Sequence, residues 1–418
     1  MTMRLPTISQ FKTQLTQMSQ QYNQVSTLQI QVATGKKLQQ ASDDPMLASQ
    51  ITSVEDYIAR LDSYTTNTTL AQNRLSLLHT TLQEQVDLTI KAQELLLRSQ
   101  NGTLNDKDRA GIAIELSGVL DQMLRLANTQ DGNSDYLFSG SASTQPYVQN
   151  GNCFQYQGSY DGNSILISDQ NQVQYSDSGY AVFGNIKSGN GTFSVAADAS
   201  MNTGTGILQP ITLLDAGSII NDDYILTMVT NSAGQLAYEI VGSSSGQVIP
   251  VPPLAAPTDA PAYTAGSSIT FNGISTQLDG APAVGDTFAI RQSRPQNVFQ
   301  TLQQVIDALN TPIASSAKNQ ADVSQILLEK SSTLSGSLNH LVDQLAGVGT
   351  RAKAVENQIK LNKDMSLNQQ VILGSLADVD MAQSISDLTQ QLTALSMSQQ
   401  SYTKIQEIFS QLMRDQFR

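Results

Sequence analysis

The residues best able to carry acid–base or metal chemistry in this chain are its two histidines, His79 and His340. Histidine titrates near neutral pH and is a common metal ligand, so a catalytic or metal-binding role is the first possibility to weigh. Each histidine lies in a stretch with helical periodicity, far from the other and from the single cysteine. We therefore interpret both as surface or seam residues of helices.

Two loops have part of the spacing of a ligand-binding motif. Asp131, Asn133 and Asp135 stand at i, i+2 and i+4, which opens a calcium loop, but the sixth position is Tyr136 where glycine is needed and no glutamate closes the loop. A capped turn is the better interpretation. Gly189-Asn190-Gly191 lacks the following helix and basic residue of a phosphate loop. Neither loop predicts a metal or cofactor.

The acidic residues of the middle third could serve a glycan-acting enzyme only if two of them converged in a pocket. They fall in no motif that we can assign, and we expect them in solvated loops: Asp215, Asp222, Asp223, Glu239, Asp259 and Asp286. An enzyme of this length without a recognisable acid–base constellation would be unusual. The sequence therefore predicts no catalytic residue, no cofactor and no enzyme.

Composition excludes further classes of protein. The chain has 418 residues, enough for two or three domains, and a formal net charge of −13. That acidity argues against nucleic-acid partners and anionic membranes, which require clustered Lys and Arg. No apolar run approaches the ~18 residues of a membrane helix, and residues 1–10 lack the apolar core of a cleaved signal peptide. The lone Cys153 excludes internal disulfides.

Both ends of the chain carry narrow apolar stripes at alternating spacings of three and four, which is typical of coiled-coil helices. Gln, Ser and Thr surround both stripes, so neither helix would be stable alone and each needs a partner. The N-terminal stripe is Phe11, Leu15, Met18, Tyr22, Val25 and Val32. The C-terminal stripe is Ile385, Leu388, Leu392, Leu395, Tyr402, Ile405, Phe409 and Leu412.

Helix-breaking residues separate these two arms from the rest of the chain. Ser42-Asp43-Asp44-Pro45 ends the first helix and restarts a second, because Ser or Asp caps a helix and Pro suits its first turn. The apolar register of a long helix beginning near Leu334 is lost across Ala377 to Asp380. We predict that Ser42, Asp43, Asp44, Pro45, Asp378 and Asp380 form a hinge.

Between the helical ends, a third helix follows a turn and cap at 101–106, and short β-branched and aromatic runs follow from Asp131. Predicted strands are 165–167, 179–183, 224–229 and 237–241, with a hairpin over 269–274 around Asn272-Gly273. The predicted fold is α+β: long coiled-coil helices from both termini form a nested rod, and an all-β domain is inserted between them.

These residues resemble a known family. Ala33-Thr34-Gly35-Lys36, the run 41–45, Asn101-Gly102-Thr103 and the run 376–382 are similar to the terminal signatures of bacterial flagellins and their relatives. The runs 131–140, 156–158, 284–288 and 401–406 are most like the flagellar hook-filament junction family, also called hook-associated protein 3. The last residues, 410–418, depart from both patterns.

The resemblance implies a structural adaptor of the bacterial flagellum that joins the hook to the flagellin filament. Implied partners are the first hook-filament junction protein, flagellin, copies of the chain in a ring, and an export chaperone at the C-terminal helix. Implied localisation is extracellular, after synthesis in the cytoplasm and type III export without a cleaved signal peptide. The implied domains are 1–45 with 376–418, 46–185 with 292–375, and 186–291.

Two alternatives stay open at the level of sequence. One is filament-forming flagellin itself, and the more distant one is a secreted binding module or enzyme whose β domain is carried on flagellin-like ends. For the junction adaptor, the sequence suggests folding coupled to assembly: a single hairpin of two arms buries too little surface to offset the ordering cost of about 1 to 2 kcal/mol per residue.

Overall fold

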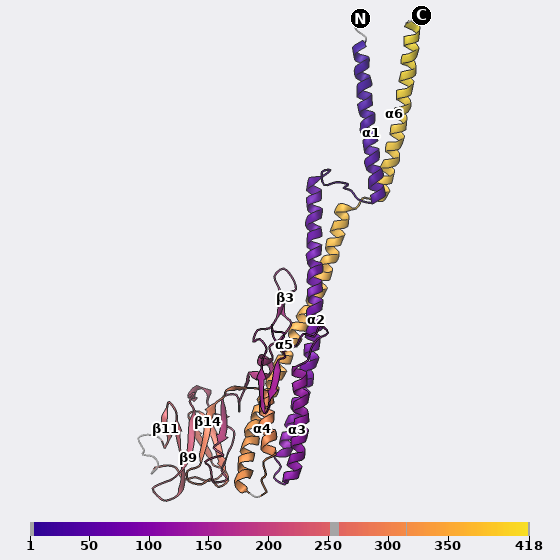
Figure 1. The fold of residues 1–418 in the computed structure, drawn as a ribbon. Coiled ribbons are helices and arrows are strands. Elements are labelled where there is room, and N and C mark those ends of the chain that lie inside the picture. Colours follow the sequence, from indigo (N-terminus) through magenta and orange to yellow (C-terminus); the bar gives the residue numbers. More distant parts are fainter. Residues whose placement is uncertain (1–3, 251–258, 315, 417–418) are drawn as a thin grey trace. The chain divides into compact units, whose positions relative to one another are not determined.

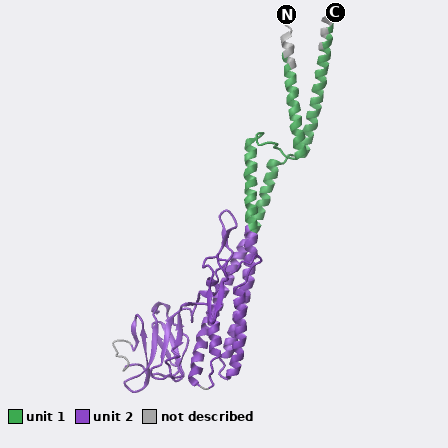
Figure 2. Ribbon diagram, in the orientation of Figure 1, with its two compact units in different colours: residues 1–66, 359–418 green, residues 67–358 purple. Residues whose placement is uncertain are grey.

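A computed structural model of the chain describes residues 4–250, 259–314 and 316–416 (Figure 1). Five long helices account for most of it: α1 (Arg4–Thr34), α2 (Pro45–Ser99), α3 (Asp106–Ala127), α5 (Ala317–Ala377) and α6 (Met381–Gln416), with the shorter α4 (Val298–Leu309). The chain divides into two compact units, residues 1–66 with 359–418 and residues 67–358 (Figure 2). The prediction of an α+β fold with long terminal helices and an inserted β domain is confirmed.

The strands lie between α3 and α4, in the second unit. They are β1 (Tyr147–Asn150), β2 (Cys153–Tyr156), β3 (Ser164–Leu166), β4 (Gln172–Gln174), β5 (Ile186–Lys187), β6 (Phe193–Ala197), β7 (Ile207–Leu208), β8 (Thr212–Leu213), β9 (Tyr224–Thr230), β10 (Leu236–Gly242), β11 (Gly246–Ile249), β12 (Ser268–Phe271), β13 (Ile274–Asp279), β14 (Thr287–Gln292) and β15 (Pro295–Gln296). An antiparallel five-stranded sheet has the order β11-β10-β9-β14-β6, and β13 joins β12, β7 and β8.

The two sheets share one apolar core, to which β6, β9, β13 and β14 each contribute alternate side chains. Leu226, Ile240, Leu278 and Phe288 in this core are fully buried. The predicted hairpin over 269–274 is confirmed: Phe271 pairs with Ile274, and Asn272 and Gly273 have positive φ angles of 43° and 75°. Positive φ at both turn residues is the requirement that makes Asn-Gly a hairpin signal.

The helical part of the second unit has a core of its own, in which Leu75, Leu78 and Leu82 of α2 are fully buried together with Leu116 and Met123 of α3. Helix α3 starts where the sequence predicts, because Asn105 and Asp108 form a reciprocal capping box. Helix α4 is capped by Asn297, whose side chain accepts a hydrogen bond from the Gln300 amide.

One strand prediction is wrong. Residues 179–183 include Tyr180, Val182 and Phe183, which favour a strand, yet residues 180–184 form a single π-helical turn. Val182 and Phe183 are buried there, and the Phe183 ring contacts Phe138 and Phe299 at centroid distances of 5.0 and 5.6 Å. The aromatic cluster therefore decides the local backbone, and a strand would turn alternate side chains away from it.

The expectation of solvated acidic residues is wrong for Asp222 and Asp286, which are buried. Asp222 accepts hydrogen bonds from the amides of Ser244 and Ser245 and from the Ser245 hydroxyl, at 2.7 to 3.0 Å. Asp286 accepts from the amides of Thr203, Gly204 and Ala283. Both carboxylates replace the solvent that their donors lose on folding.

These bonds hold the pKa of Asp222 down to about 2, chiefly through the Ser245 amide and against the opposing effect of burial. Because the folded pKa lies below the unfolded value of about 3.9, ionised Asp222 stabilises the fold above that value, and the stabilisation is lost as pH falls toward 2. We expect Asp222→Asn to lower the free energy of unfolding at pH 7. The difference from the unaltered chain should shrink as the pH approaches 2. Urea unfolding at several pH values checks this.

The exposed Asp161→Asn is the matched control for the loss of one negative charge. A deficit for Asp222→Asn that stayed constant from pH 7 to pH 2 would contradict the assigned role of the carboxylate.

Candidate assembly interface

The loops that first suggested chemistry are structural. The Asp131 carboxylate accepts hydrogen bonds from the amides of Asn133 and Asp135 and pairs with Arg74 at 2.7 Å, which confirms the capped turn. His340 contacts the Ala181 carbonyl through Nε2 at 2.7 Å, and His79 is exposed. Within the described ranges, no group of three or more His, Cys, Asp or Glu side chains is arranged to hold a metal ion.

One chemical motif escaped our reading of the sequence. Gly242-Ser243-Ser244-Ser245-Gly246 has the Gly-x-Ser-x-Gly spacing of a hydrolase nucleophile elbow, which requires a turn from a strand into a helix. Here the segment turns from β10 into β11, and Asp222 holds the amides of Ser244 and Ser245. The motif is therefore a hairpin turn.

The functional interest of the first unit lies in its two arms, α1 and α6, which meet at a short main-chain bridge. Lys36 and Asp378 form an antiparallel bridge, the Val379 amide donates to the Gly35 carbonyl at 2.9 Å, and the Lys37 amide donates to the Ala377 carbonyl at 2.8 Å. Gly35 ends α1 with a φ of 70°, a conformation that favours glycine. The chain thus joins the bases of both arms through backbone bonds.

Side-chain contacts add to the backbone bonds where α1 ends and α6 begins. Lys36 Nζ lies 2.7 Å from Asp378 Oδ1, but both side chains are 56% exposed, so the pair is worth less than about 1 kcal/mol. Asp380 accepts from the amides of Ala382 and Gln383 and caps α6. The backbone pairing and the cap, more than the ion pair, fix where α6 begins.

The other predicted hinge residues lie at the start of α2. Asp44 caps the helix by accepting from the amides of Met46 and Leu47, and Pro45 is its first residue. Asp43 accepts from the Gln39 and Gln40 amides, while Ser42 lies 3.5 Å from the Gln40 side chain. All six predicted hinge residues therefore stand at helix caps or connections, and their role as a hinge stays a prediction.

The predicted stripes divide into two sets. Every seventh residue faces the opposite arm: Val25 and Leu395 are 4% and 8% exposed, and Met18, Val32, Leu388 and Tyr402 are half-buried. The alternate members face solvent, with exposed fractions of 47% for Leu15, 64% for Tyr22, 48% for Ile385 and 43% for Leu392. Ile405 falls outside both seven-residue rows and is 42% exposed. The side chains of Phe11, Phe409 and Leu412 lie outside the described residues.

Polar side chains complete the contact between the arms where a coiled coil would place apolar ones. Gln14 and Gln21 of α1 and Ser384, Gln391 and Ser398 of α6 are buried or half-buried there. The Oε1 atom of Gln21 is buried without a hydrogen-bond partner. An orphaned buried amide oxygen costs free energy and so weakens the pairing of the two arms.

The pair of arms has two unlike faces. One carries a groove of about 430 Å³ lined by Asn23, Gln24, Thr27, Leu28, Gln31, Asp387, Gln390 and Gln391. At 100° per residue, Leu15 and Tyr22 lie on the other side of the Met18–Val25 line, and Ile385 and Leu392 lie on the corresponding side of α6. The face with the groove is therefore mainly polar, with Leu28 as the one apolar residue of the groove lining. The other face carries the exposed apolar residues Leu15, Tyr22, Ile385 and Leu392, here called the apolar face.

Comparison with known proteins places this architecture. Residues 7–143 match the family model described as the bacterial flagellin N-terminal helical region. Flagellar hook-associated protein 3 of Escherichia coli is 26% identical over 377 residues, which cover 90% of this chain and 88% of that protein.

Solved structures decide the family. The crystal structure of flagellar hook-associated protein 3 from Legionella pneumophila is 30% identical, with a TM-score of 0.74 over 78% of this chain and 98% of that one. The chain belongs to the hook-associated protein 3 family. A second Legionella structure, described as a flagellar junction protein, is 31% identical, with a TM-score of 0.68 over 74% of this chain and 99% of that one.

Membership in the hook-associated protein 3 family establishes the class of protein to which the chain belongs. The chain is a structural protein of the bacterial flagellum and not an enzyme. The family supports a hook-filament adaptor role and a place in the extracellular flagellum. Across the residues that the structure places, no helix combines the length and apolarity needed to span a bilayer.

The cap at the start of α2 gives a local test of the arm connection. We expect Asp44→Ala to lower the protection of the first-turn amides of α2 by about 1 kcal/mol, because Met46 and Leu47 lose their acceptor. Residue-resolved hydrogen exchange checks this. Asp56→Ala, in the exposed interior of the same helix, is the control, and equal effects of the two variants would exclude Asp44 as a cap.

Proposed function

We propose that this chain joins the flagellar hook to the filament by coupling the folding of its arms to assembly. On this proposal, copies form a ring between the first hook-filament junction protein and flagellin. The arms, 1–45 with 376–418, form the inner tube, 46–185 with 292–375 form the middle shell, and 186–291 form the outer domain. Membership in the hook-associated protein 3 family supports the adaptor role.

The apolar face of the arms is the observation that carries the proposal. Leu15, Tyr22, Ile385 and Leu392 are each between 43% and 64% exposed in a single chain. Burial of their apolar surface against another protein would contribute a favourable free energy of about 25 cal/mol per Å². Arms of neighbouring copies, or of the related proteins at either end of the ring, would cover them.

The energetics of one pair of arms favour ordering on assembly over ordering in the free chain. Ordering helices of 31 and 36 residues costs about 1 to 2 kcal/mol per residue in backbone entropy. Against this, the two arms bury few side chains fully, and Gln21 adds a desolvated oxygen. Lateral contacts in a tube would add the missing apolar burial, so we infer that the arms become fully helical in the polymer.

The exposed apolar residues of α6 would also suit binding by a chaperone before assembly. Helix α6 exposes Met397, Ile405 and Ile408 by 63%, 42% and 56%, in addition to Ile385 and Leu392. Exposed apolar surface of this kind binds partners or aggregates. An export chaperone that covers 376–418 until the chain leaves the cell would prevent aggregation, and type III export of an unfolded chain would follow.

The proposal is tested by placing a charge on each face of α6. We expect Leu392→Asp to abolish incorporation into the hook-filament junction, because a carboxylate buried in an apolar contact is strongly unfavourable. Gln390→Asp adds the same charge to the polar groove and should leave incorporation largely intact. Motility and the amount of the chain in purified flagella are the readouts.

Circular dichroism of both purified variants should show the same folded β domain as the unaltered chain. If Leu392→Asp were incorporated as well as Gln390→Asp, the apolar face would not be an assembly contact.

A further inference from the structure

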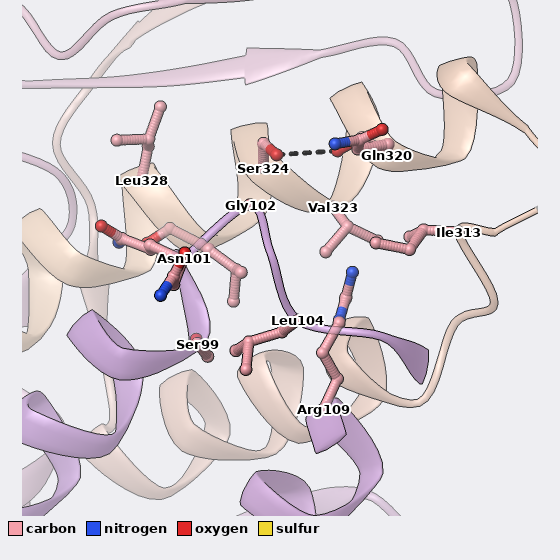
Figure 3. Close-up of a pocket in the computed structure, with 12 residues that line it drawn as sticks. Ser99, Asn101, Gly102, Leu104, Arg109, Ile313, Gln320, Val323, Ser324 and Leu328 are labelled. Carbon is pink, nitrogen blue, oxygen red and sulfur yellow. Dashed lines mark hydrogen bonds between the residues drawn. The ribbon is translucent and has the colours of Figure 1, made fainter. Parts of the chain in front are cut away.

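The lining of one pocket in the second unit includes the buried guanidinium group of Arg109. The pocket has a volume of about 210 Å³ and lies among the turn after α2, the first turns of α3 and the first turns of α5 (Figure 3). Arg109 extends from α3 into this region, near Leu104 and Ile313. Asn101, Gln320 and Ser324 supply polar side chains to the wall.

Arg109 is only 4% exposed, and its hydrogen bonding is incomplete. One Nη atom donates to the Ala308 carbonyl at the end of α4 at 3.2 Å, and Nε is buried without a partner. Burial lowers the pKa of Arg109, but a guanidinium stays charged in proteins. A buried charge with an orphaned donor is costly unless something else satisfies it.

The chain itself offers little counter-charge. Asp106 lies one turn before Arg109 and opposes the effect of burial on it, but the Asp106 carboxylate accepts hydrogen bonds from the amides of Ile313 and Ala314. None of the twelve residues lining the pocket is acidic. The pocket therefore presents a positive group, and no acidic side chain in its lining faces that group.

We propose that the pocket beside Arg109 binds a carboxylate. The planar edge of a guanidinium binds a carboxylate through two parallel hydrogen bonds, and the unpartnered Nε belongs to such an edge. The side-chain amides of Asn101 and Gln320 are further donors in the wall. The volume suits an acetate-sized group with water and is below that of pockets for drug-sized molecules.

Two sources supply this chemistry: a free small carboxylic acid, or an Asp or Glu side chain of a second copy of the chain. The chain carries 36 acidic against 23 basic residues, so copies present many carboxylates. Binding would also tie α3 and α5 together, because Arg109 comes from α3 and Gln320 and Ser324 come from α5.

Thermal unfolding of the full chain at pH 7 tests the site, with sodium acetate compared with sodium chloride at equal ionic strength. We expect acetate to raise Tm to a plateau beyond the effect of chloride, because a ligand that binds only the folded state stabilises it. Ser324→Leu should fill the pocket while keeping the Arg109–Ala308 bond, and should remove the gain. Ser331→Leu, at a half-buried site on α5 outside the pocket lining, should retain it.

A second readout reports on the guanidinium itself. The NMR signal of the Arg109 Nε–H, assigned by its loss in Arg109→Lys, should shift with acetate in the unaltered chain and not in Ser324→Leu. Equal Tm gains in acetate and chloride, or an acetate gain that survives Ser324→Leu, would overturn the proposal.

Sedimentation equilibrium separates the two sources once acetate binding is seen. A self-association that weakens in acetate and in Ser324→Leu assigns the carboxylate to a second copy. Self-association that is unchanged both by acetate and by Ser324→Leu assigns the carboxylate to a free acid. Either result supports the site.

Discussion

A pair of antiparallel helices has only one contact between its members, and this constraint governs the first unit. The contact between α1 and α6 uses every seventh residue of each apolar stripe, and the remaining apolar residues face solvent. Polar side chains such as Gln21 and Gln391 occupy positions at which apolar ones would strengthen the pair. The arms therefore leave apolar surface that one chain does not cover, which agrees with the assembly role proposed for them.

The second unit meets the opposite requirement, because it is stabilised by contacts within one chain. Its β sheets enclose a core of fully buried side chains, and the helices α2 and α3 enclose another. Arg351 of α5 pairs with Asp177, and Arg74 of α2 pairs with Asp131, so helices hold the segments that connect to the strands through largely buried ion pairs. Breaking such a pair leaves an uncompensated charge, which makes the arrangement specific. The second unit thus buries its apolar residues within one chain, whereas the arms leave several of theirs exposed.

Local signals in the sequence were enough to predict the parts of the fold that local chemistry decides. The Asn272-Gly273 hairpin, the cap before α3 and the capped turn at Asp131 are each set by residues within a few positions of one another. The π-helical turn at 180–184 was missed because Phe138 and Phe299, distant in sequence, fix it. The burial of Asp222 and Asp286 was missed because their donors lie up to 83 residues away.

The stripes of the arms were visible in the sequence, but their division into two faces was not. Leu15, Met18, Tyr22 and Val25 follow the same three-four spacing, and the side of a helix that meets its neighbour depends on where that neighbour lies. The separate polar face depends in the same way on the pairing of α1 with α6. Family resemblance supplied the role in the flagellum, which no spacing of residues specified.

Hydrogen exchange across Leu15 to Val32, compared between the free chain and assembled junctions, tests coupled folding most directly. We expect weak amide protection in the free chain and strong protection in the assembly, because neighbouring copies would cover the apolar face only there. Strong protection of these amides in the free chain, unchanged on assembly, would contradict it.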